Sequence, residues 1–127
     1  MGKANVNDVK KILLVEDNPV NRMLIKKILT FHGSEVLEAV DGRDGIEKAE
    51  KHLPNLILMD LQLPGINGLD AVKILKENDA TKNIPIVAVS ANIRDEDKIR
   101  AAEVGCVGFI EKPIDSRNFF DNISKYM

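Results

Sequence analysis

Acidic, hydroxyl and ammonium side chains stand where short apolar runs of this 127-residue chain end. Glu16 and Asp17 follow the first run, Asp60 the third, Ser90 the fourth and Lys112 the fifth. If these runs are parallel strands of one sheet, their carboxyl ends meet at one edge, where such sheets bind ligands. The sequence therefore predicts three carboxylates, one hydroxyl and one ammonium group at a single edge of the fold.

These side chains are suited to binding a hard cation and to handling a phosphoryl group. Mg²⁺ takes oxygen ligands, and a divalent cation relieves the repulsion among Glu16, Asp17 and Asp60. A carboxylate such as Asp60 is also able to act as a nucleophile and form an aspartyl phosphate. Ser90 supplies a hydrogen-bond donor and Lys112 a compact positive charge. Taken singly, each residue has an ordinary interpretation as a helix cap, turn hydroxyl or surface lysine, but their joint occurrence favours the functional one.

Five β-α repeats are predicted to position these residues. The apolar runs cover 12–15, 36–40, 56–59, 86–89 and 107–110. The helical patterns run from Pro19 to before Gly33, over 43–52, from Asn67 or Gly68 onward, over 94–104 and over 116–126. Strands alternating with helices imply a parallel sheet with right-handed crossovers. The predicted fold is an α/β three-layer sandwich of the flavodoxin-like (βα)5 type.

The charges near each run indicate its place in the sheet. The runs at 12–15, 56–59 and 86–89 are continuously apolar, which is typical of strands buried on both faces. The runs at 36–40 and 107–110 adjoin or contain charged residues and are expected at the edges. The strand order 2-1-3-4-5 fits this pattern. The order 2-3-1-4-5 leaves the same two strands at the edges.

Composition excludes several classes of protein. A chain of 127 residues with 44% hydrophobic and 30% charged residues is typical of one globular domain. Its net charge of -2 offers no basic surplus for nucleic acid. No apolar run approaches the roughly 20 residues of a membrane helix, and the single Cys106 fits a reducing compartment. We therefore predict one domain over residues 10–127 after a polar lead-in at 1–9, with a cytoplasmic location.

Five motifs of the chain resemble the receiver domain of two-component response regulators. They are ILLVEDN at 12–18, LILMDLQLPG at 56–65, Gly68, IVAVSA at 86–91 and the Lys-Pro pair at 112–113. The motifs occur in the order and spacing of that family and cover nearly all of residues 10–127. Within the family, the chain most resembles stand-alone regulators of the DivK kind.

This resemblance implies a phosphoacceptor and a metal site. Asp60 would accept a phosphoryl group from a phosphohistidine on a sensor histidine kinase or a histidine phosphotransfer protein. Glu16, Asp17, Asp60 and the backbone carbonyl of Gln62 would bind Mg²⁺, with Mn²⁺ as an alternative ion.

The resemblance also implies how the phosphorylated state is held and transmitted. Ser90 and Lys112 would hold the phosphoryl oxygens, and the bond before Pro113 would be cis. Phe109 would turn inward as Ser90 moves toward the phosphate, which changes a surface for a downstream protein. The alternative for Phe109 is plain core packing. The regulator would be a monomer or a phosphorylation-dependent dimer.

Three alternatives to a stand-alone phosphoacceptor exist: an enzyme on the same fold, an inert interaction module and a domain of a larger protein. The residues present disfavour the first two. An aspartyl phosphatase on the same fold usually has a second acid where Gln62 stands, and flavin or nucleotide sites need a glycine-rich loop where Asn18 and Pro19 stand. An inert interaction module would not need the full set of five polar residues. The chain is also compatible with a receiver domain taken from a hybrid histidine kinase or a larger regulator.

Overall fold

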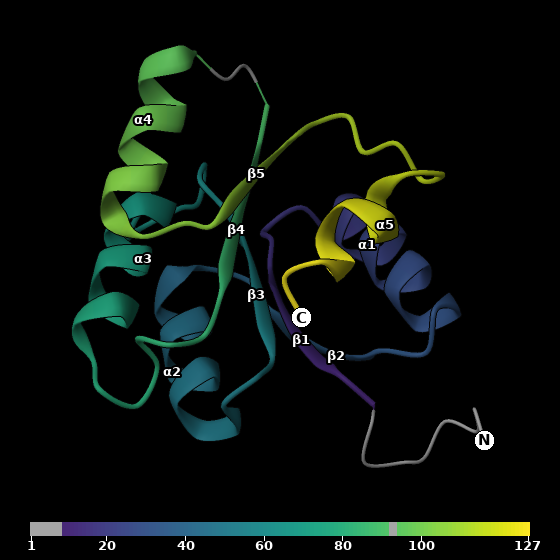
Figure 1. Cartoon of the computed structure of the whole chain (residues 1–127), viewed down its shortest axis with the longest axis horizontal. Coiled ribbons are helices and arrows are strands. Elements are labelled where there is room, and N and C mark those ends of the chain that lie inside the picture. The colour runs from purple at the N-terminus through teal and green to yellow at the C-terminus, as the bar shows by residue number, and fades with distance from the viewer. Residues whose placement is uncertain (1–8, 92–93) are drawn as a thin grey trace.

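The computed structural model describes residues 9–91 and 94–127, which form strands and helices in strict alternation (Figure 1). The strands are β1 (Lys11–Val15), β2 (Glu35–Ala39), β3 (Leu56–Asp60), β4 (Ile86–Ser90) and β5 (Gly108–Glu111). The helices are α1 (Pro19–Phe31), α2 (Gly42–His52), α3 (Gly68–Glu77), α4 (Asp95–Val104) and α5 (Phe119–Ser124). Of the predicted lead-in at 1–9, residues 1–8 lie outside the described residues. No helix within the described ranges has the length and apolar character to cross a membrane.

The five strands form one parallel sheet in the order β2-β1-β3-β4-β5. Strand β1 pairs with both β2 and β3, which confirms the order 2-1-3-4-5 and excludes the alternative 2-3-1-4-5. The two strands with nearby charges, β2 and β5, lie at the edges as predicted, because each pairs with one neighbour.

Helices cover both faces of the sheet and make a three-layer sandwich (Figure 1). Successive side chains of a strand point to opposite faces, so Leu13 and Val15 pack in one cluster with residues of α2 and α3. Ile12 and Leu14 pack in the other cluster with residues of α1 and α5. Burial of each such aliphatic side chain contributes about 1.5–3 kcal/mol, and the central strands are therefore held rigidly between two apolar layers.

Helix α1 begins and ends where the sequence predicts. The side chain of Asn18 accepts hydrogen bonds from the backbone N–H groups of Val20 and Asn21, at 2.9 and 3.1 Å, and Pro19 occupies the first helical position. The helix ends before Gly33, whose φ of 88° is in the left-handed region that glycine adopts readily. The cap fixes the direction of α1 directly beside the acidic end of β1.

Helix α5 is shorter than the predicted segment 116–126. It spans Phe119–Ser124 because the carboxylate of Asp115 organises a turn before it. This carboxylate accepts hydrogen bonds from the N–H of Arg117 and from Nδ2 of Asn118, both at 3.0 Å. Phe119 and Ile123 are still buried against the sheet, so the helix covers its face of the core with fewer turns than expected.

A close backbone approach beside β3 leads to the first prediction. A Cβ at Gly68 would collide with the carbonyl oxygen of Asp60 and lie 2.5 Å from Cα of Leu61. Both neighbours belong to the backbone and cannot rotate away. Gly68→Ala is therefore expected to push α3 off the strand end and cost about 1–3 kcal/mol. Urea unfolding measures this, and a variant as stable as the parent would contradict the close approach.

Candidate functional site

The sheet register brings four of the predicted site residues to one edge. Glu16 follows β1, Asp60 ends β3, Ser90 ends β4 and Lys112 follows β5. The pairing of β1 with β3, β3 with β4, and β4 with β5 places these ends in one row. The backbone N–H of Lys112 donates to the carbonyl oxygen of Ser90 at 2.8 Å, so this row is held by the backbone itself.

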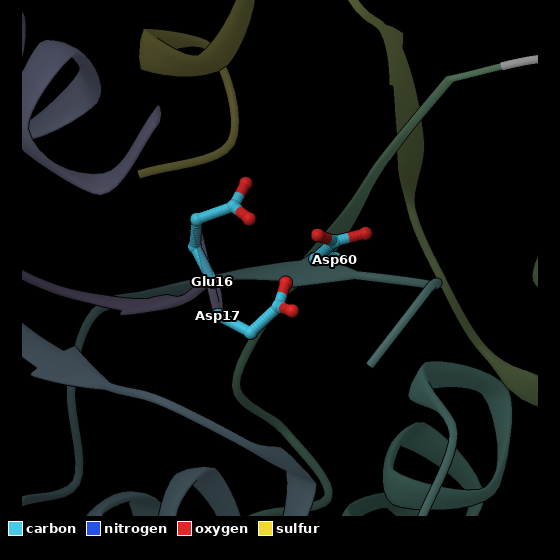
Figure 2. Close-up of side chains that lie close together, drawn as sticks. All are labelled: Glu16, Asp17 and Asp60. Atoms are coloured by element: carbon cyan, nitrogen blue, oxygen red, sulfur yellow. The ribbon is translucent and has the colours of Figure 1, made fainter. Parts of the chain in front are cut away.

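Three carboxylates gather at this edge (Figure 2). One oxygen from each of Glu16, Asp17 and Asp60 lies within 4.8 Å of the others. Glu16 and Asp60 are buried, whereas Asp17 is exposed. The cluster therefore has two carboxylates fixed at its base and a third at its open side.

Lys112 contacts both buried carboxylates. Its Nζ lies 2.7 Å from Oε1 of Glu16 and 3.1 Å from Oδ2 of Asp60. The side chains of Lys112, Glu16 and Asp60 are 15%, 2% and 3% exposed, respectively. The other oxygen of Asp60, Oδ1, accepts a hydrogen bond of 2.9 Å from the backbone N–H of Gln62. The Asp60 carboxylate is thus oriented by two donors.

Burial perturbs the charges of this cluster. Loss of solvation raises the pKa of Glu16, and the neighbouring Asp60 raises it further, against the opposing effect of Lys112. Burial lowers the pKa of Lys112, but its contacts with Glu16 and Asp60 outweigh burial and leave a net increase. When all four groups are ionised, three carboxylates and one ammonium leave two negative charges. One divalent cation would balance them.

The residues present fit a hard divalent cation. Oε1 of Glu16 is buried and lies 2.7 Å from Nζ of Lys112. One ammonium shared by two buried carboxylates neutralises only part of their charge, and Mg²⁺ and Mn²⁺ prefer carboxylate oxygens as ligands. The carboxylate donor set and the net charge of the cluster both point to a cation between Glu16, Asp17 and Asp60.

The remaining predicted residues lie around this cluster. Ser90 is buried, and its hydroxyl donates to the carbonyl oxygen of Ala91 at 3.2 Å. Phe109 is half-buried in the adjacent edge strand, and the Lys112–Pro113 peptide bond is cis. The contact of Ser90 with a phosphoryl group, the switch role of Phe109 and the metal-binding carbonyl of Gln62 stay predictions.

The sequence did not single out Arg22, which contacts the acidic loop. Its Nη1 donates to the carbonyl oxygen of Glu16 at 2.9 Å and to that of Asp17 at 3.4 Å. Arg22 stands four residues after the helix cap Asn18, which is about one helical turn. A residue one turn after the cap has its side chain over the loop that precedes the helix. The spacing between Asn18 and Arg22 could therefore have predicted this contact.

The fold and the acidic cluster together define a class of protein. The flavodoxin-like sheet carries three carboxylates, a hydroxyl and a lysine at its carboxyl edge, where sheets of this kind bind ligands. The family model described as the response regulator receiver domain matches residues 12–124 of the chain. The chain belongs to this family.

Individual relatives agree with this assignment. The polar-differentiation response regulator DivK of Brucella anthropi is 36% identical over 118 residues, which cover 93% of this chain and 96% of the relative. Chemotaxis protein CheY4 of Vibrio cholerae superposes with a TM-score of 0.89 at 27% identity, covering 94% of this chain and 99% of the other.

A third relative carries a metal ion. The receiver domain of sensor histidine kinase PA1611 from Pseudomonas aeruginosa, solved with a magnesium ion coordinated in its active site cleft, is 30% identical to this chain. It has a TM-score of 0.86 and covers 93% of this chain and 97% of the other. The relatives of this chain therefore include both response regulators and a receiver domain that is part of a sensor histidine kinase.

Proposed function

We propose that this chain is a phosphoacceptor switch in which Asp60 takes a phosphoryl group from a phosphohistidine. In the transfer, a carboxylate oxygen of Asp60 forms a P–O bond as the P–N bond to the imidazole breaks, and the imidazole keeps the electron pair. The observation that carries the proposal is the buried Asp60 carboxylate, oriented by the N–H of Gln62 and by Lys112. Phosphoryl transfer monitored by intact mass tests it.

Glu16, Asp17, Asp60 and the backbone carbonyl of Gln62 would hold Mg²⁺, or Mn²⁺ in its place. When bound, the ion supplies charge neutralisation for the phosphoryl oxygens and aligns them with the attacking carboxylate. Lys112 adds a second positive charge within reach of the same carboxylate. The chain acts in this account as a switch that is itself modified, not as an enzyme with a separate product.

Asp17→Ala is expected to weaken Mg²⁺ binding by about tenfold or more, or about 1.4 kcal/mol. The variant loses the one exposed carboxylate of the cluster. Isothermal titration calorimetry measures the affinity. Asp79→Ala is the matched control, because it removes the same charge from a side chain that is 95% exposed in α3's flanking turn. Equal Mg²⁺ affinity in both variants and the parent would contradict the carboxylate assignment.

Phosphorylation would then move groups that now make local contacts. A phosphoryl group adds about -1.5 to -2 charge and three acceptor oxygens. The Ser90 hydroxyl, now bonded to the neighbouring carbonyl of Ala91, is a donor free to exchange partners. Phe109 lies in the next strand, and α4 buries Ala101 but leaves Ile99 60% exposed. This lightly anchored region is the surface that we expect to change for a downstream protein.

The phosphoryl donor and the cellular location of the protein are the last two parts of the proposal. A sensor histidine kinase or a histidine phosphotransfer protein would supply the phosphohistidine. The described part of the chain has one free cysteine, Cys106, and burial raises the pKa of its thiol to about 11. An unreactive thiol and a kinase donor are both compatible with the cytoplasm, where we place the protein.

A receiver domain of a hybrid histidine kinase is the second candidate. It is favoured by the likeness to the receiver of the sensor histidine kinase PA1611, which is 30% identical. The two candidates differ in the length of the native protein. Intact mass of the protein isolated from its own cells should match 127 residues for a stand-alone regulator and exceed it for a kinase domain.

A further inference from the structure

We propose that Arg22 is a positioning residue for the acidic site. Its guanidinium holds the backbone of Glu16 and Asp17 and thereby sets the direction of their two carboxylates. The inference rests on the Mg²⁺ site proposed above and adds a residue that lies behind that site.

The guanidinium of Arg22 joins three parts of the fold. Nη1 donates to the carbonyl oxygens of Glu16 and Asp17, at 2.9 and 3.4 Å. Nε lies 3.3 Å from Oε1 of Glu38 in strand β2. The side chains of Arg22 and Glu38 are 20% and 35% exposed, respectively, so the guanidinium is partly shielded from water. Helix α1 is thus tied to the loop after β1 and to the neighbouring edge strand.

These contacts complete the hydrogen bonding of the turn that carries the ligands. The N–H of Glu16 donates to the carbonyl oxygen of Ala39 at 3.0 Å, and Oε2 of Glu16 accepts from the N–H of Asn18 at 3.2 Å. The carbonyl of Glu16 has left the strand ladder, and Arg22 is its partner. Holding this carbonyl and that of Asp17 fixes the two peptide planes on either side of the Asp17 Cα and one of the two beside the Glu16 Cα. It thereby restricts the directions in which both side chains project.

Glu38 makes this arrangement compatible with a nearby cation. An unpaired guanidinium beside the site would repel Mg²⁺. The hydrogen bond from Lys26, followed by the charges of Lys26 and Arg22, lowers the pKa of Glu38 against a smaller opposing effect of burial. Glu38 therefore stays ionised and neutralises part of the positive charge of Arg22, since it also pairs with Lys26. A lysine at position 22 has a single nitrogen and cannot bond the loop carbonyls and Glu38 from separate atoms.

The test compares Mg²⁺ affinity in three variants by isothermal titration calorimetry. Arg22→Met is expected to bind Mg²⁺ about 10- to 100-fold more weakly, the usual loss when a group supporting metal ligands is removed. Arg22→Lys should fall between Arg22→Met and the parent. Lys26→Met is the matched control, because Lys26 pairs with the same Glu38 carboxylate at 2.9 Å and has no contact with the loop carbonyls. It should stay within about twofold of the parent, as expected for an exposed pair.

Amide hydrogen exchange without metal provides a readout that does not depend on Mg²⁺. The N–H groups of Glu16 and Asn18 should exchange faster in Arg22→Met and unchanged in Lys26→Met, while those of β4 stay as in the parent. Unchanged exchange and unchanged affinity in Arg22→Met overturn the proposal, as does an equal loss of affinity in Lys26→Met. If the parent itself binds no Mg²⁺, the metal site proposed above fails, and faster exchange in Arg22→Met alone then supports the role of Arg22 in the loop.

Discussion

Asp60→Asn is expected to abolish phosphoryl incorporation while leaving the fold intact. The amide keeps the shape of the carboxylate and can still accept the hydrogen bond that the N–H of Gln62 donates at 2.9 Å. It lacks the negative oxygen that forms the P–O bond. The substitution also leaves Glu16 as the one buried carboxylate of the cluster that Lys112 contacts.

Reduction of the acyl phosphate with borohydride, followed by peptide mapping, locates the modified residue. The expected product is a single reduced aspartate at position 60 in the parent protein and none in Asp60→Asn. Asp17 serves as the internal control, because it lies in the same cluster and is the most accessible of the three carboxylates. Modification at Asp17 in place of Asp60 would contradict the assignment of the phosphoacceptor.

Lys112→Met is expected to destabilise the metal-free protein by about 3–5 kcal/mol, the usual cost of removing one partner of a buried ion pair. The change leaves Glu16 and Asp60, whose side chains are 2% and 3% exposed, without the cation that both now contact. Added Mg²⁺ should recover part of this loss, because a divalent ion bound to the folded state replaces the missing charge.

Urea unfolding with and without Mg²⁺ measures both effects of Lys112→Met. Lys82→Met is the matched control, because its pair with Asp79 is between side chains 49% and 95% exposed. That variant should lose less than about 1 kcal/mol and should not respond to Mg²⁺. Equal stability of the two variants would show that Lys112 does not compensate the buried carboxylates.

Much of the fold could be predicted from alternation of apolar runs and helix signals. The polar residues at the ends of strands were informative because every parallel strand ends at the same edge. Three strands, β3, β4 and β5, run one residue further than the apolar runs, so that Asp60, Ser90 and Glu111 are themselves paired in the sheet. Whether a polar residue pairs in a sheet depends on the length of the neighbouring strand. The hydropathy pattern of its own strand therefore cannot predict that pairing.

Side-chain contacts between distant segments could not be predicted from spacing. The sequence placed Lys112 near the carboxylates, but its contact with both Glu16 and Asp60 depends on the sheet register and on where the chain turns after β5. The role of Arg22 depends on the carbonyls of the loop, which carry no sequence signal of their own. The short α5 likewise follows from the side-chain contacts of Asp115.

The central claim is that this chain accepts one phosphoryl group in a Mg²⁺-dependent reaction. The most direct test is its intact mass after incubation with a phosphorylated histidine donor protein or with acetyl phosphate, with and without Mg²⁺. We predict one added phosphoryl group with Mg²⁺ present and none after chelation. An unchanged mass with both donors in the presence of Mg²⁺ would contradict the claim.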